Sequence, residues 1–183
     1  MKGLVIKTTG KDYTVKTVNG EIIKSFLKGN FRIKGIKSTN PIVVGDIVDL
    51  SKDSGEWVIN TLYERKNSIT RKSVNLSKQT HIIAANIDQA ILMVTLESPV
   101  TTTGFIDRFL VAGEAYGIDI IILFNKIDIL EKKIRKRALN LKKMYQEIGY
   151  RCFSGSIIKD DLSNLKKTMM SKVNMISGHS GVG

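Results

Sequence analysis

The sequence predicts two domains, an N-terminal all-β barrel followed by an α/β domain, and three features support this division. Short apolar runs bounded by turn residues occupy positions 4–69, which is typical of small antiparallel barrels. Apolar runs that alternate with amphipathic stretches occupy the second half, which is typical of a parallel sheet with crossover helices. A polar stretch at 67–80 separates the two patterns and suggests an interdomain linker. We therefore expect domains at 1–72 and 73–183.

The first domain carries a regular series of strand signals. Strands are expected at 3–6, 13–18, 21–26, 31–36, 46–50 and 57–62. Asn19-Gly20 lies between two of these runs and predicts a two-residue hairpin turn. So many short strands in so short a segment favour a five-stranded OB-type barrel, a fold that commonly binds nucleic acid. Trp57 lies within a strand pattern, so we expect it in the barrel core.

The net charge of +12 and the pI of about 9.8 favour a polyanionic partner. Residues 1–75 carry fourteen Lys and Arg against seven Asp and Glu, which concentrates the charge in the barrel. Basic residues around one aromatic suit a surface that follows phosphates and stacks bases. The candidate RNA-binding residues are Lys28, Phe31, Arg32, Lys34 and Lys37. The alternatives are a solvated strand face with Phe31 in the core, and a basic domain without a nucleic-acid role.

The second domain alternates strands and helices. Strands are expected at 88–95, 120–124, 150–153 and 172–176, and a short helix at 161–169. A helix at 104–116 would bury Phe105, Phe109, Ala112 and Tyr116 on one face. A second helix at 131–148 has an apolar stripe of Ile134, Ala138, Leu141, Tyr145 and Ile148, and Gly149 is its expected C-cap. The basic residues opposite that stripe are interpreted first as a solvated face.

The apolar run at 120–124 shows no alternation, so the strand should be covered on both faces, and Asn125-Lys126-Ile127-Asp128 follows directly. The Asp128 carboxylate can accept two hydrogen bonds from N1–H and N2–H₂ of guanine, a donor pair that adenine lacks. The Lys126 stem can lie along the purine, and the Asn125 amide can bridge neighbouring loops. The alternative is a polar turn in which Asp128 caps a helix.

A glycine-rich segment, Gly178-His179-Ser180-Gly181-Val182-Gly183, follows the last predicted strand. Gly178 and Gly183 have the spacing of a phosphate-binding loop, G-x-x-x-x-G-K-[S/T], whose Lys and Ser/Thr would come next. A dinucleotide-binding turn would need the order G-x-G-x-x-G and a later acidic residue, neither of which is present.

Composition excludes several other classes. No run of about 18 apolar residues occurs and the first residues do not form a secretion signal, so we expect a cytosolic protein. Two His and the single Cys152 cannot assemble a zinc site, and Cys152 is expected to be a small buried hydrophobe. His81 and His179 are interpreted as structural and as a variable loop position, respectively.

Taken together, the basic barrel, the Asn125–Asp128 motif and the later Gly178–Gly183 loop resemble the ribosome-small-subunit-dependent GTPase A (RsgA) family, whose GTPase domain is circularly permuted. The resemblance extends over all 183 residues and includes Gly29-Asn30-Phe31-Arg32 and Phe105-Ile106-Asp107-Arg108-Phe109. It implies a cytoplasmic GTPase with an OB barrel and a P-loop domain, which acts in late maturation of the small ribosomal subunit. The implied partners are that subunit, its rRNA and GTP or GDP; no membrane is involved, and we expect a monomer.

By the same resemblance, the nucleotide contacts come from three segments. Ser154-Gly155-Ser156 would be a second loop at the base, with Gly155 or Ser156 offering a backbone N–H to guanine, and a plain turn is the alternative. The implied GTP-binding residues are Asn125, Lys126, Ile127, Asp128, Ser154, Gly155, Ser156, Gly178, His179, Ser180, Gly181, Val182 and Gly183.

The chain also departs from the family pattern. It lacks the phosphate-loop Lys, the Mg²⁺-binding Ser/Thr, a later Thr switch, the Asp-x-x-Gly loop and the C-terminal Cys/His zinc domain. Phosphoryl transfer needs Lys and Mg²⁺ to neutralise developing charge, so we expect this chain alone to be hydrolytically inactive and to be the N-terminal part of a longer GTPase. Mg²⁺ ligands are expected beyond residue 183 and Zn²⁺ only in the further domain; this chain should hold no metal and names no catalytic residue. The alternative is a non-catalytic rRNA-binding module with a degenerate nucleotide fold.

Overall fold

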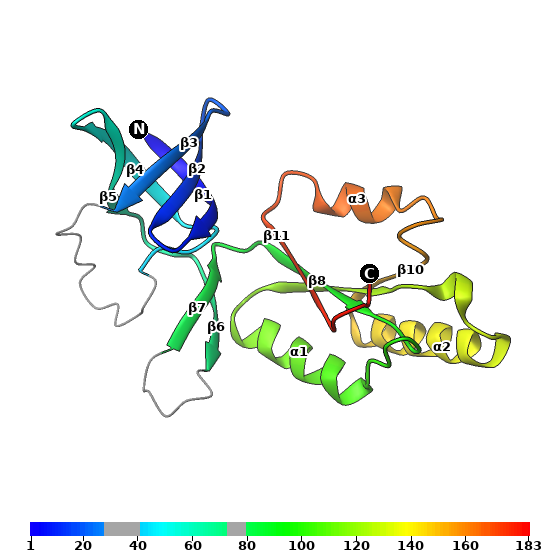
Figure 1. Cartoon of the computed structure of the whole chain (residues 1–183). Coiled ribbons are helices and arrows are strands. Elements are labelled where there is room, and N and C mark those ends of the chain that lie inside the picture. Colours follow the sequence, from blue (N-terminus) through cyan, green and yellow to red (C-terminus); the bar gives the residue numbers. More distant parts are fainter. Residues whose placement is uncertain (28–40, 73–79) are drawn as a thin grey trace. The chain divides into compact units, whose positions relative to one another are not determined.

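A computed structural model describes residues 1–27, 41–72 and 80–183. The chain divides into two compact units, Met1–Ile87 and Asp88–Gly183, which we describe separately. Figure 1 shows their strands and helices in sequence colours.

The first unit contains a closed five-stranded barrel. Its strands are β1 (Lys2–Thr9), β2 (Asp12–Thr17), β3 (Ile22–Leu27), β4 (Ile47–Asp53) and β5 (Glu56–Leu62), in the order β1-β2-β3-β5-β4. β3 and β5 are parallel, the other neighbours are antiparallel, and β4 pairs with β1 to close the barrel. This OB-like barrel confirms the predicted fold class. The strand expected at 31–36, and with it Lys28, Phe31, Arg32, Lys34 and Lys37, lies outside the described residues.

Alternate residues of these strands point inward and form the barrel core. Val5, Val15, Val48 and Ile59 are fully buried there. Trp57 is partly buried and packs against this core, as the strand pattern predicted. The inward positions follow the period of two that a sheet with one wet face requires.

The polar stretch that we expected to be a linker contains paired strands. β6 (Ser68–Lys72) lies at its start and pairs in antiparallel fashion with β7 (Thr80–Ala85) at its end. The prediction of a linker was wrong, because the polar side chains of this stretch gave no strand pattern although its backbone groups pair. The end of β7 meets the barrel at Gly45, where a side chain would collide with the backbone of Ala85. Gly45 also has φ +93, which glycine adopts without strain. The hairpin is therefore part of the first compact unit, which extends to Ile87.

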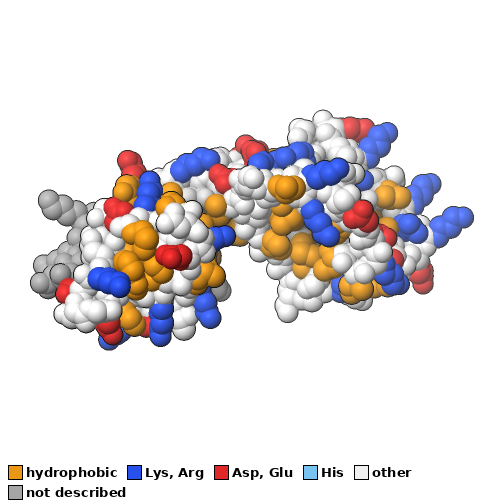
Figure 2. Space-filling model, turned by 90° about the horizontal axis from the view of Figure 1, so that it is seen from above, with side chains coloured by type: hydrophobic (Ala, Val, Ile, Leu, Met, Phe, Trp, Pro, Cys, Tyr) orange, Lys and Arg blue, Asp and Glu red, His pale blue; other side chains and the backbone are white. Residues whose placement is uncertain are grey.

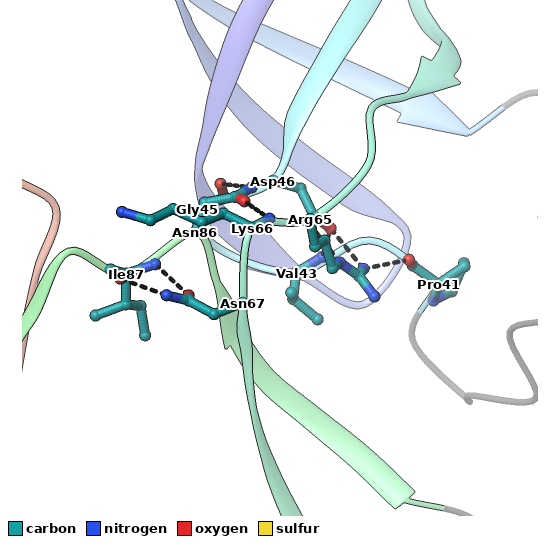
Figure 3. A network of polar contacts seen from close by, with 9 residues as sticks. All are labelled: Pro41, Val43, Gly45, Asp46, Arg65, Lys66, Asn67, Asn86 and Ile87. Carbon is teal, nitrogen blue, oxygen red and sulfur yellow. Dashed lines mark hydrogen bonds and ion pairs between the residues drawn. The ribbon is translucent and has the colours of Figure 1, made fainter. Parts of the chain in front are cut away.

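A buried ion pair holds the segment just before β6 against the segment just before β4 (Figure 3). Asp46 has no exposed side-chain surface, and its two carboxylate oxygens accept from Nε and an Nη of Arg65 at 2.7 and 2.8 Å. Arg65 also donates to the carbonyl oxygen of Pro41 at 2.9 Å, and Asp46 accepts from the backbone N–H of Val43 at 2.8 Å. Bidentate geometry and these additional bonds compensate for the cost of burying two charges.

Two asparagines complete the same network (Figure 3). Asn86, at φ 53, accepts from the backbone N–H of Lys66 at 2.7 Å and donates to the carbonyl oxygen of Gly45 at 2.9 Å. Asn67 bonds both backbone groups of Ile87 at 2.8 Å. Side-chain amides thus take the place of ladder bonds where the hairpin begins and ends.

The second unit is a four-stranded parallel sheet in the order β10-β9-β8-β11. Its strands are β8 (Gln89–Val94), β9 (Asp119–Phe124), β10 (Arg151–Ser154) and β11 (Asn174–Gly178). Helices α1 (Thr103–Ala115) and α2 (Lys132–Ile148) cover one face, and α3 (Ser163–Met169) covers the other (Figure 1). Residues 120–124 are buried throughout, which confirms the doubly covered strand.

The helices match their predicted bounds more closely than their predicted faces. α1 buries Ile106, Leu110 and Gly113, whereas the expected Ala112 and Tyr116 are exposed. The sheet sets this orientation because Gly113 allows Ile120 to approach the helix closely. α2 buries Ala138 and Tyr145 and ends at Gly149 with φ 114, which confirms the C-cap.

Charged and apolar groups are both present on the surface shown in Figure 2, where a group of hydrophobic side chains on the barrel is bordered by Lys and Arg. Cys152 is buried, as expected, and burial raises the pKa of its thiol to about 11, so the thiol is unreactive at neutral pH. Within the described ranges, no helix is both long and apolar enough to span a bilayer.

Candidate functional site

The carboxyl ends of the strands of the second unit are joined by the side chain of Asn125, which follows β9 and is only 2% exposed. Its Nδ2 donates to the carbonyl oxygen of Val182 in the glycine-rich loop at 2.7 Å. Its Oδ1 accepts from the backbone N–H of Ile157 at 3.0 Å, in the loop after β10. Its backbone N–H donates to the carbonyl oxygen of Val94 at the end of β8. One residue therefore holds three loops in register, as the residue pattern predicted for its amide.

Lys126 makes a second link to the glycine-rich loop. It adopts the left-handed conformation, φ 59 and ψ 28, which turns the chain away from the strand. Its Nζ donates to the carbonyl oxygens of Gly181 at 2.6 Å and Ser98 at 2.7 Å. The ammonium group is thereby held between two backbone carbonyl groups, and Lys126 lines the cavity described below.

Asp128 lies in the 3-10 turn η1 (Ile127–Ile129), and its side chain is 19% exposed. Its Oδ2 lies 3.0 Å from Nζ of Lys159. The hydrogen bond from Lys159, aided by one from Ser156, lowers the pKa of the Asp128 carboxyl, so it is ionised at neutral pH. The alternative role as a helix cap is wrong, because Glu131 is the N-cap of α2.

These side chains surround an open cavity of about 420 Å³, large enough for a purine base. Its lining comprises Asn125, Lys126, Asp128, Ile129, Ser156, Ile157, Ile158, Lys159, Gly181 and Gly183. Ile158 is 89% exposed and Ile129 is also exposed, so two apolar side chains stand beside the charged ones. This arrangement offers apolar contact to the faces of a planar ring and a carboxylate to its edge.

Ile127, Ser154 and Gly155 were predicted at the site but lie outside this lining. Ile127 is buried, and the Ser154 hydroxyl accepts from Lys142 at 3.1 Å. The backbone N–H of Gly155 donates to the carbonyl oxygen of Phe124, and that of Ser156 donates to Asp160 at 2.7 Å. These two N–H groups are engaged within the protein, whereas Ser156 contributes its side chain to the cavity wall.

The glycine-rich loop curves from the end of β11 toward Asn125. Gly181 has φ +84, and a Cβ on Gly183 would collide with the side chains of Met93 and Ile157. His179 is turned aside and its ring packs on Phe105 of α1, with centroids 4.1 Å apart. Gly178 and Ser180, also predicted at the site, complete the loop without lining the cavity. A glycine-rich backbone of this kind suits a phosphate, because no bulky side chains cover its N–H groups. One of these groups, the N–H of Val182, donates to the carbonyl oxygen of His179 at 3.2 Å.

Four lining residues were not predicted from the sequence, namely Ile129, Ile157, Ile158 and Lys159. They follow the recognised motifs by one to three positions, where no pattern distinguishes them from ordinary loop residues.

As for metals, the described part of the chain contains no group of three His, Cys, Asp or Glu side chains placed to hold an ion.

An OB-like barrel followed by an α/β unit in which the Asn125–Asp128 loop precedes the glycine-rich loop defines the class of circularly permuted P-loop proteins. Solved structures agree with this class. YjeQ from Thermotoga maritima is 31% identical with a TM-score of 0.79, and YloQ, described as a circularly permuted GTPase, is 28% identical with a TM-score of 0.75. Each comparison covers 100% of this chain and 61% of the other.

Family models make the assignment specific. The RsgA N-terminal domain matches residues 2–57 and the RsgA GTPase model matches residues 62–183. The chain belongs to the RsgA family. Proteins called small ribosomal subunit biogenesis GTPase RsgA are 55% identical in Flavobacterium johnsoniae and 52% identical in Azobacteroides pseudotrichonymphae. The whole chain aligns with 58% and 60% of those two proteins, so it spans a little over half of their length.

Proposed function

We propose that the second unit binds the guanine base of GTP and GDP and that the gene product containing this chain is a GTPase. The observation that carries this proposal is the ionised Asp128 carboxylate in a cavity bordered by the glycine-rich loop. Asp128 accepts from N1–H and N2–H₂ of guanine, Lys126 lies along one face of the ring, and the loop N–H groups face the phosphates. Ile129 and Ile158 supply apolar contact to the ring.

The test exchanges Asp128 for Asn in the gene product that contains this chain. Asparagine supplies a donor where the carboxylate was, so it should match the additional carbonyl oxygen of xanthine. We expect GDP affinity to fall by at least tenfold and xanthosine diphosphate to bind in its place, measured by calorimetry. Unchanged GDP affinity would refute the base-site assignment.

We propose further that the barrel docks on rRNA of the small ribosomal subunit in the cytoplasm, during biogenesis of that subunit. The density of positive charge in residues 1–75 supports this, as does the family to which the chain belongs. GTP hydrolysis would then be coupled to docking. A non-catalytic rRNA-binding module is the competing proposal, and it predicts subunit binding that no guanine nucleotide changes.

The docking proposal is tested by replacing Arg32, Lys34 and Lys37 together with Ala. We expect weaker binding to the small subunit and a log–log salt slope that is smaller by about one for each phosphate that the variant no longer neutralises. The matched control replaces Lys132, Lys133 and Lys136 of α2, which removes the same charge from the other unit. Equally weakened binding by both variants would show a general charge effect and contradict docking through the barrel.

A further inference from the structure

An ion pair joins two residues that line the cavity proposed to bind the base. Nζ of Lys159 lies 3.0 Å from Oδ2 of Asp128, and both residues line the cavity of about 420 Å³. The other two polar motif residues are bonded to the protein framework, because Asn125 and Lys126 hold backbone groups of neighbouring loops. Asp128 differs from them in that side chains of the loop after β10 contact its carboxylate, namely Ser156 and Lys159. The Lys159 side chain is 66% exposed.

The chemistry of this contact resembles that of the expected ligand. Guanine offers the carboxylate two adjacent N–H donors, and a lysine ammonium offers up to three N–H donors to the same oxygens. An Asp128 oxygen held by Lys159 must release or share that cation when the base approaches in the plane of the carboxylate. Lys159 and guanine therefore compete for one acceptor group.

We propose that Lys159 occupies the Asp128 carboxylate in the nucleotide-free site and is displaced by guanine, so that Lys159 lowers the affinity for guanine nucleotides. This inference rests on the proposed base site. Lys159 is a positioning residue in this scheme, since it acts on the nucleotide through Asp128.

The local structure allows the exchange without rearrangement of the loop. The backbone N–H groups of Lys159 and Asp160 donate to the carbonyl oxygen of Ser156, and Asp160 accepts from the N–H of Ser156 at 2.7 Å. These bonds hold the turn while the exposed Lys159 side chain rotates. Displacement therefore involves only one ion pair and the rotamers of one side chain.

The size of the effect follows from the exposure of the pair. Ion pairs of this kind contribute little in water, and their removal corresponds to a change in affinity of about two- to fivefold. Lys159→Met in the gene product that contains this chain should therefore bind GDP about two- to fivefold more tightly, measured by calorimetry. Lys166→Met, on the exposed side of α3, removes the same charge away from the cavity and should leave affinity unchanged or slightly lower.

A double-mutant cycle separates competition from other causes. In the Asp128→Asn background, the ion pair is absent, so Lys159→Met should not change the affinity for xanthosine diphosphate. A similar gain in that background would show a new apolar contact and would overturn the proposal, as would unchanged or weaker GDP binding by Lys159→Met alone. Asp128→Asn that keeps its preference for GDP would refute the base site itself, whereas failure limited to Lys159→Met refutes only the competition.

Discussion

The two units each contain a carboxylate paired with a cation, and the two pairs differ in almost every respect except distance. In the barrel unit, Asp46 is fully buried, Arg65 is 12% exposed, and their closest atoms are 2.7 Å apart. In the α/β unit, Asp128 is 19% and Lys159 is 66% exposed, with closest atoms 3.0 Å apart. Arg65 binds in a bidentate manner and also holds a backbone carbonyl, whereas Lys159 makes one contact. The first pair belongs to a closed network and the second faces a cavity.

Burial and the number of additional bonds therefore determine whether an ion pair stabilises the fold or can be exchanged for a ligand. A fully satisfied buried pair fixes backbone segments, because removal of one partner leaves an uncompensated charge. A pair whose cation is largely exposed contributes little stability, and that cation can be exchanged for a ligand. The asparagines do not divide in this way, since the side chains of Asn67, Asn86 and Asn125 all bond backbone groups.

The largest expected effect is on the stability of the barrel unit. Asp46→Ala leaves Arg65 without its carboxylate in a buried position and should cost about 3–5 kcal/mol of unfolding free energy. Trp57 is the single tryptophan and packs on the barrel core, so its fluorescence during urea unfolding reports this unit. Asp12→Ala, which breaks the exposed pair with Lys24, is the control and should cost about 1 kcal/mol or less. An equally small loss for Asp46→Ala would contradict the role of the network.

The smallest expected effect is on the stability of the α/β unit, which contains the Asp128–Lys159 pair. Asp128→Asn, which switches nucleotide preference in our proposal, should leave the stability of the α/β unit unchanged because its ion pair is exposed. Alkylation of the single Cys152 in increasing urea reports the unfolding of this unit, since the native thiol is buried and has a raised pKa. A loss as large as that of Asp46→Ala would mean that the Asp128 pair is structural.

Much of the site was predictable because its signals are local. An unalternated apolar run identifies a doubly covered strand, and the residues directly after it must lie at its carboxyl end. Asn125, Lys126 and Asp128 were therefore placed correctly at a loop edge, with Gly181 and Gly183 near them. The cavity walls contributed by Ile129, Ile158 and Lys159 were missed, because spatial proximity across two loops leaves no periodic trace in the sequence.

The sequence by itself determined the two fold classes, the place of the turn at Asn19-Gly20, the cap at Gly149 and the order of the Asn125–Asp128 and Gly178–Gly183 segments, since each depends on neighbours in the chain. The expected length of that turn, two residues, was wrong, because β2 ends at Thr17, β3 begins at Ile22 and the backbone N–H of Thr17 donates to the carbonyl oxygen of Glu21. Only the tertiary structure decided that residues 68–85 begin and end as paired strands, that α1 buries Ile106 and Leu110, and that Lys159 meets Asp128. Strand pairing, the buried face of a helix and the partner of a charge all depend on contacts between distant residues. Those contacts are selected by the packing of the whole unit, which no local pattern encodes.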